Sequence, residues 1–208
     1  MAKSKQLRET NIKRSKVPES ERSGFSRRDL KRVVGKLLET VDFAACLDGL
    51  QQLPQAKCIN ALVGYLSESR REVRSRAAAA LGEFVAKLFD EGNEREARIM
   101  MRRLMWGLTE ESGSIIWGAP EAMGEVVARC DGLAKEYAPL LVSLVNPAGN
   151  FLEHEPLLCS VVRAIECAAK ARRKLMVELD AAHYLRPLLD SPHQELQAAA
   201  KKALTTLT

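Results

Sequence analysis

VRSRAAAALGEFV, residues 73–85, is the first of four copies of one pattern. The others are IIWGAPEAMGEVV at 115–127, LLCSVVRAIECAA at 157–169 and LQAAAKKALTTL at 196–207, at intervals of 42, 42 and 39 residues. In each copy, apolar residues recur at i, i+4, i+7 and i+8, the spacing of one face of an α-helix. The four resulting columns are Val73, Ile115, Leu157 and Leu196; Ala77, Ala119, Val161 and Ala200; Ala80, Ala122, Ala164 and Ala203; and Leu81, Met123, Ile165 and Leu204.

A second apolar helix precedes each copy, so each repeat consists of helix A, a turn and helix B. The A-helix columns are Ile59, Leu62 and Leu66; Met101, Leu104 and Leu108; Ala138, Leu141 and Val145; and Ala182, Leu185 and Leu189. A single helix pair cannot bury its apolar face alone, so stacked pairs must supply a continuous core. The predicted fold class is all-α, an α-solenoid of antiparallel helix pairs.

The segments VRSRAAAALGEF (73–84) and GAPEAMGEVV (118–127), with weaker versions at 157–168 and 196–207, resemble the HEAT and phycobilisome-lyase HEAT-like repeats. The central segment is also similar to a bacterial group of HEAT-repeat proteins to which no activity is assigned. The resemblance covers about residues 54–208 and implies a solenoid of HEAT-like pairs. The four expected repeats span about residues 54–92, 93–131, 132–171 and 172–208.

The N-terminal part of the chain differs from the repeats. Residues 26–53 are expected to form a capping helix pair, opened by a capping box from Ser26 to Asp29, with Asp42 capping the second helix. Residues 1–25 have few apolar groups and many charges, which predicts a disordered basic tail.

The charge of the chain is concentrated in its first residues. The net charge is +5, while residues 1–32 hold eleven Lys or Arg and four Asp or Glu. A tail that binds nucleic acid through phosphates is therefore one alternative function, and its affinity would fall with salt. Its basic residues are Lys3, Lys5, Arg8, Lys13, Arg14, Lys16, Arg22, Arg27 and Arg28.

The composition argues against several other classes of protein. No stretch reaches the roughly 18 apolar residues of a membrane span, and the N-terminus lacks the apolar part of a secretory signal. We expect a soluble cytoplasmic protein without membrane contact. The five cysteines are scattered and form no CxxC motif, which disfavours a disulfide framework or a zinc knuckle.

The most unusual segment leads into the second helix B. Pro120 falls where the first repeat has Ala78, so this helix should begin late, near Gly118 or Ala119. Trp117, Glu121 and Glu125 follow at four-residue steps and are expected to face the inner side of the stack. By the repeat register, Glu121 should lie opposite Arg163.

The turns between helices A and B should line up along one acidic edge. The turn at 146–156 is five residues longer than its counterparts and adds Phe151, His154 and Glu155. HEAT-like hydroxylases that bind iron use several His-Glu pairs, whereas this chain has only one, His154-Glu155, and it lies in the inserted turn. His154 with the carboxylates of Glu110 and Glu111 from a neighbouring turn could still bind a divalent ion weakly. A simpler interpretation makes them ordinary turn residues, with Glu121 and Arg163 as an inter-repeat ion pair.

The predicted function is a non-catalytic protein-interaction scaffold or adaptor, with another protein as partner and no cofactor. A HEAT-like lyase or metal-dependent enzyme using the loops at 109–125 and 150–155 is the enzyme alternative. The residues predicted to bind the partner are Glu110, Glu111, Trp117, Glu121, Glu125, Phe151, His154, Glu155 and Arg163.

The repeat columns yield a first test. Leu81→Ala should lower the free energy of unfolding by about 2–5 kcal/mol, because it deletes a large side chain from the shared core. Chemical denaturation followed by circular dichroism measures this loss. A loss below about 1 kcal/mol would contradict the column assignment, since only surface positions tolerate such truncation.

Overall fold

The computed structural model describes residues 26–108 and 115–208, so the predicted tail at 1–25 lies outside the described residues. This part of the chain contains helices and no strand. Its elements are α1 (Arg27–Leu38), α2 (Phe43–Gln51), α3 (Gln55–Tyr65), α4 (Arg71–Asp90), α5 (Glu94–Trp106), α6 (Ala119–Arg129), α7 (Asp131–Ser143), α8 (Glu155–Glu178), α9 (Ala181–Leu185), the 3-10 helix η2 (Arg186–Asp190) and α10 (Gln194–Leu207).

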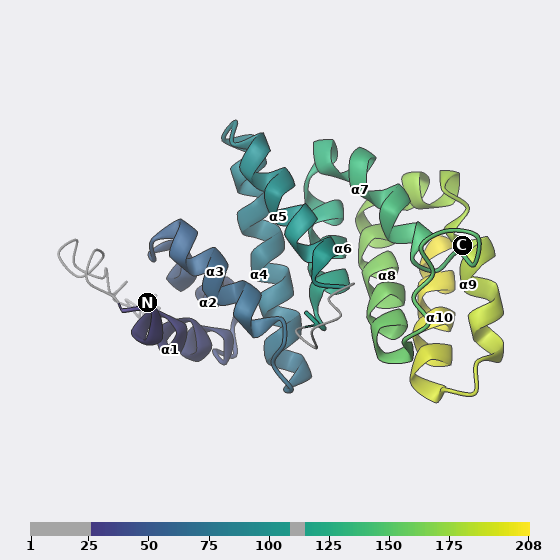
Figure 1. The fold of residues 1–208 in the computed structure, drawn as a ribbon, viewed down its shortest axis with the longest axis horizontal. Coiled ribbons are helices and arrows are strands. Elements are labelled where there is room, and N and C mark those ends of the chain that lie inside the picture. Colours follow the sequence, from purple (N-terminus) through teal and green to yellow (C-terminus); the bar gives the residue numbers. More distant parts are fainter. Residues whose placement is uncertain (1–25, 109–114) are drawn as a thin grey trace, which may run out of the picture.

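The helices form two layers (Figure 1). Helices α4, α6, α8 and α10 lie side by side, each in extensive contact with the next, and we call them the B row. Helices α3, α5, α7 and α9 form the A layer, which contacts the B row far more than its own members contact one another. The predicted all-α solenoid of helical repeats is confirmed.

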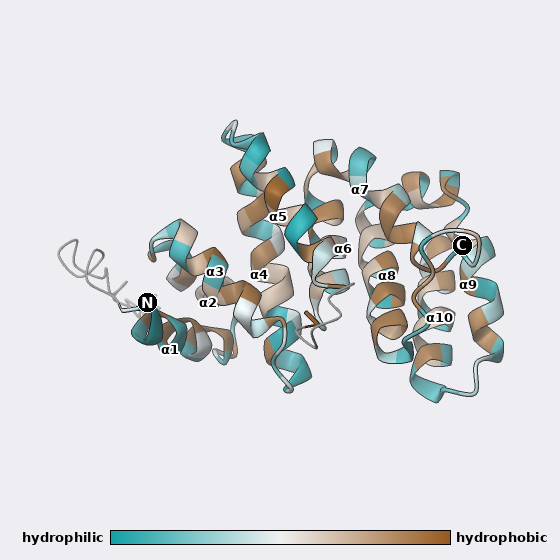
Figure 2. Ribbon diagram, viewed as in Figure 1, coloured by the Kyte–Doolittle hydropathy of each residue, from teal (hydrophilic) through white to brown (hydrophobic). Residues whose placement is uncertain are grey.

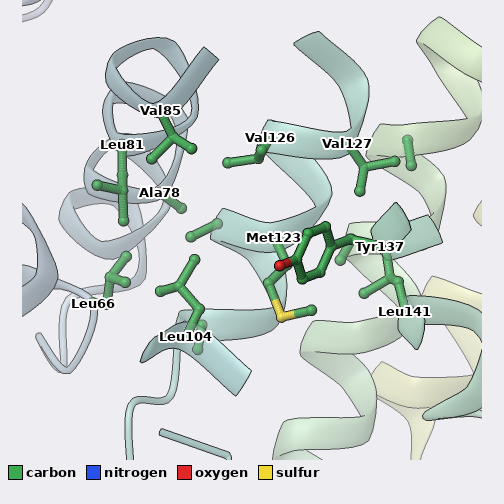
Figure 3. Close-up of a cluster of buried hydrophobic side chains, with 14 of the residues drawn as sticks. Leu66, Ala78, Leu81, Val85, Leu104, Met123, Val126, Val127, Tyr137 and Leu141 are labelled. Atoms are coloured by element: carbon green, nitrogen blue, oxygen red, sulfur yellow. The ribbon is translucent and has the colours of Figure 1, made fainter. Parts of the chain in front are cut away.

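The predicted columns form the core between the layers. All of their members on the B row are buried except Ile115 and Leu204, which are half-buried. Figure 2 shows apolar residues along the facing sides of the helices, whereas α1 is mostly hydrophilic. In Figure 3, Leu81 of α4, Leu104 of α5, Met123 of α6 and Leu141 of α7 belong to one buried cluster. The core thus runs across repeats rather than within single pairs.

Two glycines set the spacing of the B row. Gly82 and Gly124 occupy the same register position, directly after the last column. A Cβ atom on Gly124 would lie 2.6 Å from the backbone oxygen of Ala164, and one on Gly82 would lie 2.7 Å from the Cβ of Glu125. Any larger side chain at these positions would push neighbouring helices apart.

The helix starts follow the sequence signals. The Ser26 hydroxyl accepts a hydrogen bond from the amide of Asp29 (3.1 Å), and the Asp42 carboxylate accepts one from the amide of Ala44 (2.9 Å). Helix α6 begins at Ala119 with Pro120 in its first turn, so the predicted late start is confirmed. Proline is tolerated there because its missing N–H would have no intrahelical partner.

The N-terminal pair is attached to the B row by one arginine. The Arg76 guanidinium of α4 donates hydrogen bonds to the carbonyls of Leu38 (3.1 Å) and Val41 (2.9 Å) and also to that of Thr40. These carbonyls end α1 and begin the turn to α2, where no helical donor remains for them. Arg76 therefore holds this turn against the first repeat.

The fourth helix A departs from the predicted pattern. Helix α9 ends at Leu185 and continues as the 3-10 helix η2, and both Ala182 and Leu189 are only half-buried. Pro187 explains the change, because proline cannot donate the backbone hydrogen bond that an α-helix needs there. The last repeat consequently covers the core with a shorter, tighter element.

The glycine contacts predict a matched pair of outcomes. Gly124→Ala should destabilise the protein by about 1–3 kcal/mol, because the new methyl group meets backbone atoms of α8. Gly64→Ala should stabilise it by about 0.5–1 kcal/mol, since no atom lies within 4 Å of that Cβ position and alanine favours a helix. Thermal or chemical denaturation of both variants measures the difference. Equal effects would mean that the B helices are not in close contact at Gly124.

Candidate binding groove

The exposed face of the B row is hollowed into a groove of about 410 Å³. Residues from all four B helices line it, and we call it the B-row groove. Its charged lining residues are the basic Arg71, Arg163, Lys170 and Lys202 and the acidic Glu121, Glu125, Glu166 and Glu195. Positive and negative side chains are equal in number. The groove therefore offers both donors and acceptors for hydrogen bonds, and its lining carries no net charge.

Glu121 lies at the floor of the B-row groove and is only 8% exposed. Arg74 Nε lies 3.8 Å from one of its carboxylate oxygens and Arg163 Nη1 lies 3.8 Å from the other. Both separations exceed hydrogen-bond length. Glu121 Oε2 and Arg74 Nε are both buried and form no hydrogen bond within the described part of the chain. An acceptor of the groove lining, Glu121 Oε2, is therefore left open, while Arg74 does not line the groove.

The environment of Glu121 disfavours its charge. Burial raises the pKa of this carboxyl group, and the nearby guanidinium groups of Arg74, Arg163 and Arg71 only partly oppose the rise. Burial dominates because water can no longer solvate the carboxylate, while the arginines are too far away to donate to it. The predicted ion pair of Glu121 with Arg163 is present, but it is buried rather than exposed.

Glu166 is the second buried carboxylate of the groove, and its surroundings lower its pKa, whereas those of Glu121 raise its pKa. It is 5% exposed, and Lys170 Nζ and Lys202 Nζ lie 2.7 Å and 3.2 Å from its Oε1. Burial alone would raise the pKa of Glu166, but hydrogen bonds from Lys170 and Lys202 outweigh burial and lower it. The surroundings of Glu166 thus favour its carboxylate form, whereas burial disfavours the charged form of Glu121.

The remaining polar contacts extend along α6. Arg129 Nε donates to a Glu83 oxygen at 2.6 Å, and Arg129 also pairs with Glu125. Burial raises the pKa of the neighbouring Cys167 thiol to about 12, with the negative charge of Glu125 adding to the rise. At neutral pH this thiol stays protonated and is a poor nucleophile. All five cysteines of the chain are free.

The turn edge contains a separate cluster. The rings of Trp117 and His154 lie 5.2 Å apart, and Trp117 is 36% exposed. His193, which precedes α10, pairs with Glu155. Phe151 is half-buried and packs against the core. Glu110 and Glu111 lie outside the described residues.

The predicted site residues therefore fall into two groups. Glu121, Glu125 and Arg163 meet in the B-row groove. Trp117 does not share their helical face, contrary to prediction, because α6 begins only at Ala119. It lies instead at the turn edge with His154. The helical spacing that relates Glu121 to Glu125 therefore does not continue back to Trp117.

The sequence patterns missed Glu166, which lines the groove, and Arg74, which does not line it but pairs with Glu121. Glu166 stands at the register position where the two preceding repeats have Gly82 and Gly124. This change from glycine to glutamate was a visible signal of a polar function at the third repeat. The repeat pattern gives no comparable signal for Arg74, because the residues at the same position in the other repeats show no glycine-to-charge change of this kind.

The structure does not assemble the metal site considered above. Across residues 26–108 and 115–208, no three His, Cys, Asp or Glu side chains are grouped so as to hold a metal ion. His154 contacts Trp117, while Glu155 pairs with His193. Within the same ranges, no helix combines the length and apolarity that a bilayer crossing requires.

Known structures resemble this chain, although no family model and no curated protein matches it. A designed armadillo repeat protein in complex with the peptide (KR)4 aligns with a TM-score of 0.52 and 20% identity, covering 87% of this chain and 82% of that one. A computationally designed armadillo repeat protein for modular peptide recognition aligns with a TM-score of 0.51 and 21% identity, covering 87% and 83%. An engineered protein aligns with a TM-score of 0.51 and 18% identity, covering 91% and 88%. These similarities show the fold, an armadillo-like solenoid of helical repeats.

The two buried carboxyls predict opposite pH dependences. The folded protein binds the Glu121 proton more tightly than the unfolded chain, so wild-type stability should fall relative to Glu121→Gln as pH rises from about 4 to 7. The pKa of Glu166 is lowered, so wild type should lose stability relative to Glu166→Gln as pH falls below about 4.5, the ordinary pKa of a glutamate. Melting temperatures of the three proteins across both pH ranges measure these trends. Parallel curves for the two variants would show that the carboxyls do not differ in protonation.

Proposed function

We propose that this chain is a non-catalytic protein-interaction scaffold of HEAT-like repeats that binds a segment of a partner protein in the B-row groove. Residues 54–208 supply the four repeats in this proposal, and the helix pair at 26–53 caps their N-terminal end. The observation that carries the proposal is Glu121, a buried carboxyl group that lines a groove spanning four helices and whose Oε2 accepts no hydrogen bond within the described part of the chain. Buried polar groups are normally hydrogen-bonded, so an open acceptor inside a groove fits a ligand that donates to it.

The groove favours a polypeptide over a simple ion. Four basic and four acidic side chains line it, and a backbone segment presents N–H donors and C=O acceptors in alternation. An amide N–H could donate to Glu121, while a carbonyl could accept from Arg71. Armadillo-like neighbours support this use of the fold, since one was solved with a peptide and another was designed for peptide recognition.

The turn edge would extend the same binding surface. Arg163 pairs with Glu121 inside the groove and with Glu195 at its end, and Glu195 follows directly after the edge residue His193 in the chain. Trp117 is a large amphipathic side chain of the kind enriched in binding hot spots. A partner leaving the groove at Glu195 would reach Trp117, and in this proposal also Glu110, Glu111, Phe151 and His154.

The alternatives remain hypotheses with less support. A nucleic-acid function would rest on residues 1–25 together with Arg27 and Arg28.

An enzyme would need a side chain activated for catalysis, such as a cysteine in its thiolate form. Burial keeps the pKa of Cys58 and of Cys167 raised to about 12, and it also raises the pKa of Cys46, Cys130 and Cys159. No thiolate nucleophile is therefore prepared among the cysteines.

Blocking the groove tests the proposal. Peptides that bind the wild-type protein are first selected from a display library, and their affinities are then measured for Ala198→Trp and Ala45→Trp. Both alanines are exposed on helices, but Ala198 lines the groove while Ala45 lies on α2. Ala198→Trp should weaken binding at least about tenfold, because the indole fills space that the peptide needs. Ala45→Trp should bind like wild type.

Melting temperatures separate this effect from unfolding. Both tryptophan variants should melt within a few degrees of wild type, since neither alanine is buried. Trp117→Ala should weaken binding of the same peptides without a large loss of stability if the edge takes part. Equal binding by wild type and Ala198→Trp would overturn the groove as the binding site.

A further inference from the structure

A second groove lies between α1, α3 and α5, on the A layer rather than on the B row. It has a volume of about 390 Å³. Its cationic lining residues are Arg27, Lys31, Lys57 and Arg103, and no carboxylate lines it. The apolar residues Leu30 and Ala61 contribute to its wall. We call it the basic groove.

The charges of the basic groove are not neutralised within residues 26–108 and 115–208. Arg103 Nη1 donates to the neutral Asn60 Oδ1 at 2.7 Å, and Lys31 Nζ lies 5.7 Å from the centre of the Tyr65 ring. Neither contact supplies negative charge. In this part of the chain, none of the four cations forms an ion pair. Four like charges around one hollow repel each other, and an anion entering it would relieve that repulsion.

Several other basic side chains of the protein form ion pairs with glutamates, unlike the four cations of the basic groove. On the same helix α5, Arg98 forms ion pairs with Glu94 and Glu136. In the B-row groove, Arg163 is shared by two glutamates and Lys170 is bound to Glu166. The lack of carboxylates around the basic groove is therefore a local property of this surface.

An apolar surface adjoins the basic groove. Ile99, Met105 and Trp106 line a neighbouring hollow of about 480 Å³, and Arg103 lines both hollows. Trp106 is 79% exposed and Ile99 is 45% exposed, which is unusual for such large apolar side chains. Exposed apolar patches rimmed by polar residues are typical of protein-binding surfaces.

We propose that the basic groove and the adjoining apolar hollow together bind an acidic segment of a partner protein that also carries apolar side chains. Carboxylates of the segment would pair with Lys31, Lys57 and Arg103. An apolar side chain beside them would cover Ile99 and Trp106. Because this surface is on the A layer, it is separate from the B-row groove and adds a second binding site to the scaffold.

Charge argues against two other occupants. Residues 1–25 of this chain contain seven Lys or Arg and three Glu, so like charge disfavours docking of the chain's own tail. A long polynucleotide would need a continuous basic track. Here Glu94 and Glu96 stand in the first turn of α5 and interrupt such a track along that helix. A short acidic protein segment fits the limited extent of the positive surface.

The proposal is tested with fluorescein-labelled peptides (DEL)4, (DES)4 and (KRL)4, together with a twenty-nucleotide oligo-dT, by fluorescence anisotropy at low ionic strength. Wild type should bind (DEL)4 saturably and more tightly than (DES)4, which lacks the apolar side chains, and should not bind (KRL)4 at this surface. The double variant Lys31→Glu with Lys57→Glu should lose at least about tenfold in affinity for (DEL)4. Trp106→Ala should bring the affinity for (DEL)4 down to that for (DES)4.

The controls separate local from general effects. Lys135→Glu with Lys201→Glu makes the same change in net charge at exposed positions on α7 and α10, away from both grooves, and should bind (DEL)4 like wild type. Ala198→Trp should also leave (DEL)4 binding unchanged, since it blocks only the B-row groove. The inference would be overturned by no saturable binding of (DEL)4, by equal losses in the two charge-reversed double variants, or by tighter binding of oligo-dT than of (DEL)4.

Discussion

The close approach of α4, α6 and α8 through small residues is the constraint on which the rest of the molecule depends. Gly82 and Gly124 leave room for the backbone and Cβ atoms of the next helix, and the alanine columns beside them are fully buried. Contact at this distance gains dispersion energy along the whole B row, although alanine and glycine carry little apolar surface each. The A layer fills the outer side with larger residues such as Leu104 and Leu141. The two layers therefore differ in the size of the side chains that fill them.

The same close stacking creates the chemistry of the B-row groove. Arg74, Glu121 and Arg163 come from three successive B helices, so the burial of Glu121 between two half-buried arginines requires the stacking of repeats. Stacking removes water from Glu121 without bringing either arginine within hydrogen-bond distance, so its charged form is disfavoured. At the third repeat glutamate replaces the spacing glycine, and Glu166 reaches two lysines that neutralise it. Two carboxyls in one groove thus differ because one has direct donors and the other does not.

Much of this architecture was predictable from periodicity alone. The columns identified the buried faces of the B helices, and Pro120 placed the late start of α6. Periodicity specifies which face of a helix is buried, but it does not specify which side chains of neighbouring helices meet beside that face. The contact of Trp117 with His154 and the salt bridges of Glu166 depend on such lateral distances. The shortened fourth helix A depended on Pro187, a local signal that the degenerate repeat pattern obscured.

The two grooves differ in how their charges are balanced, and this difference has consequences for binding. In the proposed function, a ligand of the B-row groove would compete with existing ion pairs such as Arg163 with Glu195, so its affinity would depend on donating a hydrogen bond to Glu121. A ligand of the basic groove displaces no ion pair, and its attraction is long-range and weakened by salt. The first surface therefore favours selectivity and the second favours fast association. Since one lies on the B row and the other on the A layer, a scaffold with both could hold two different segments at the same time.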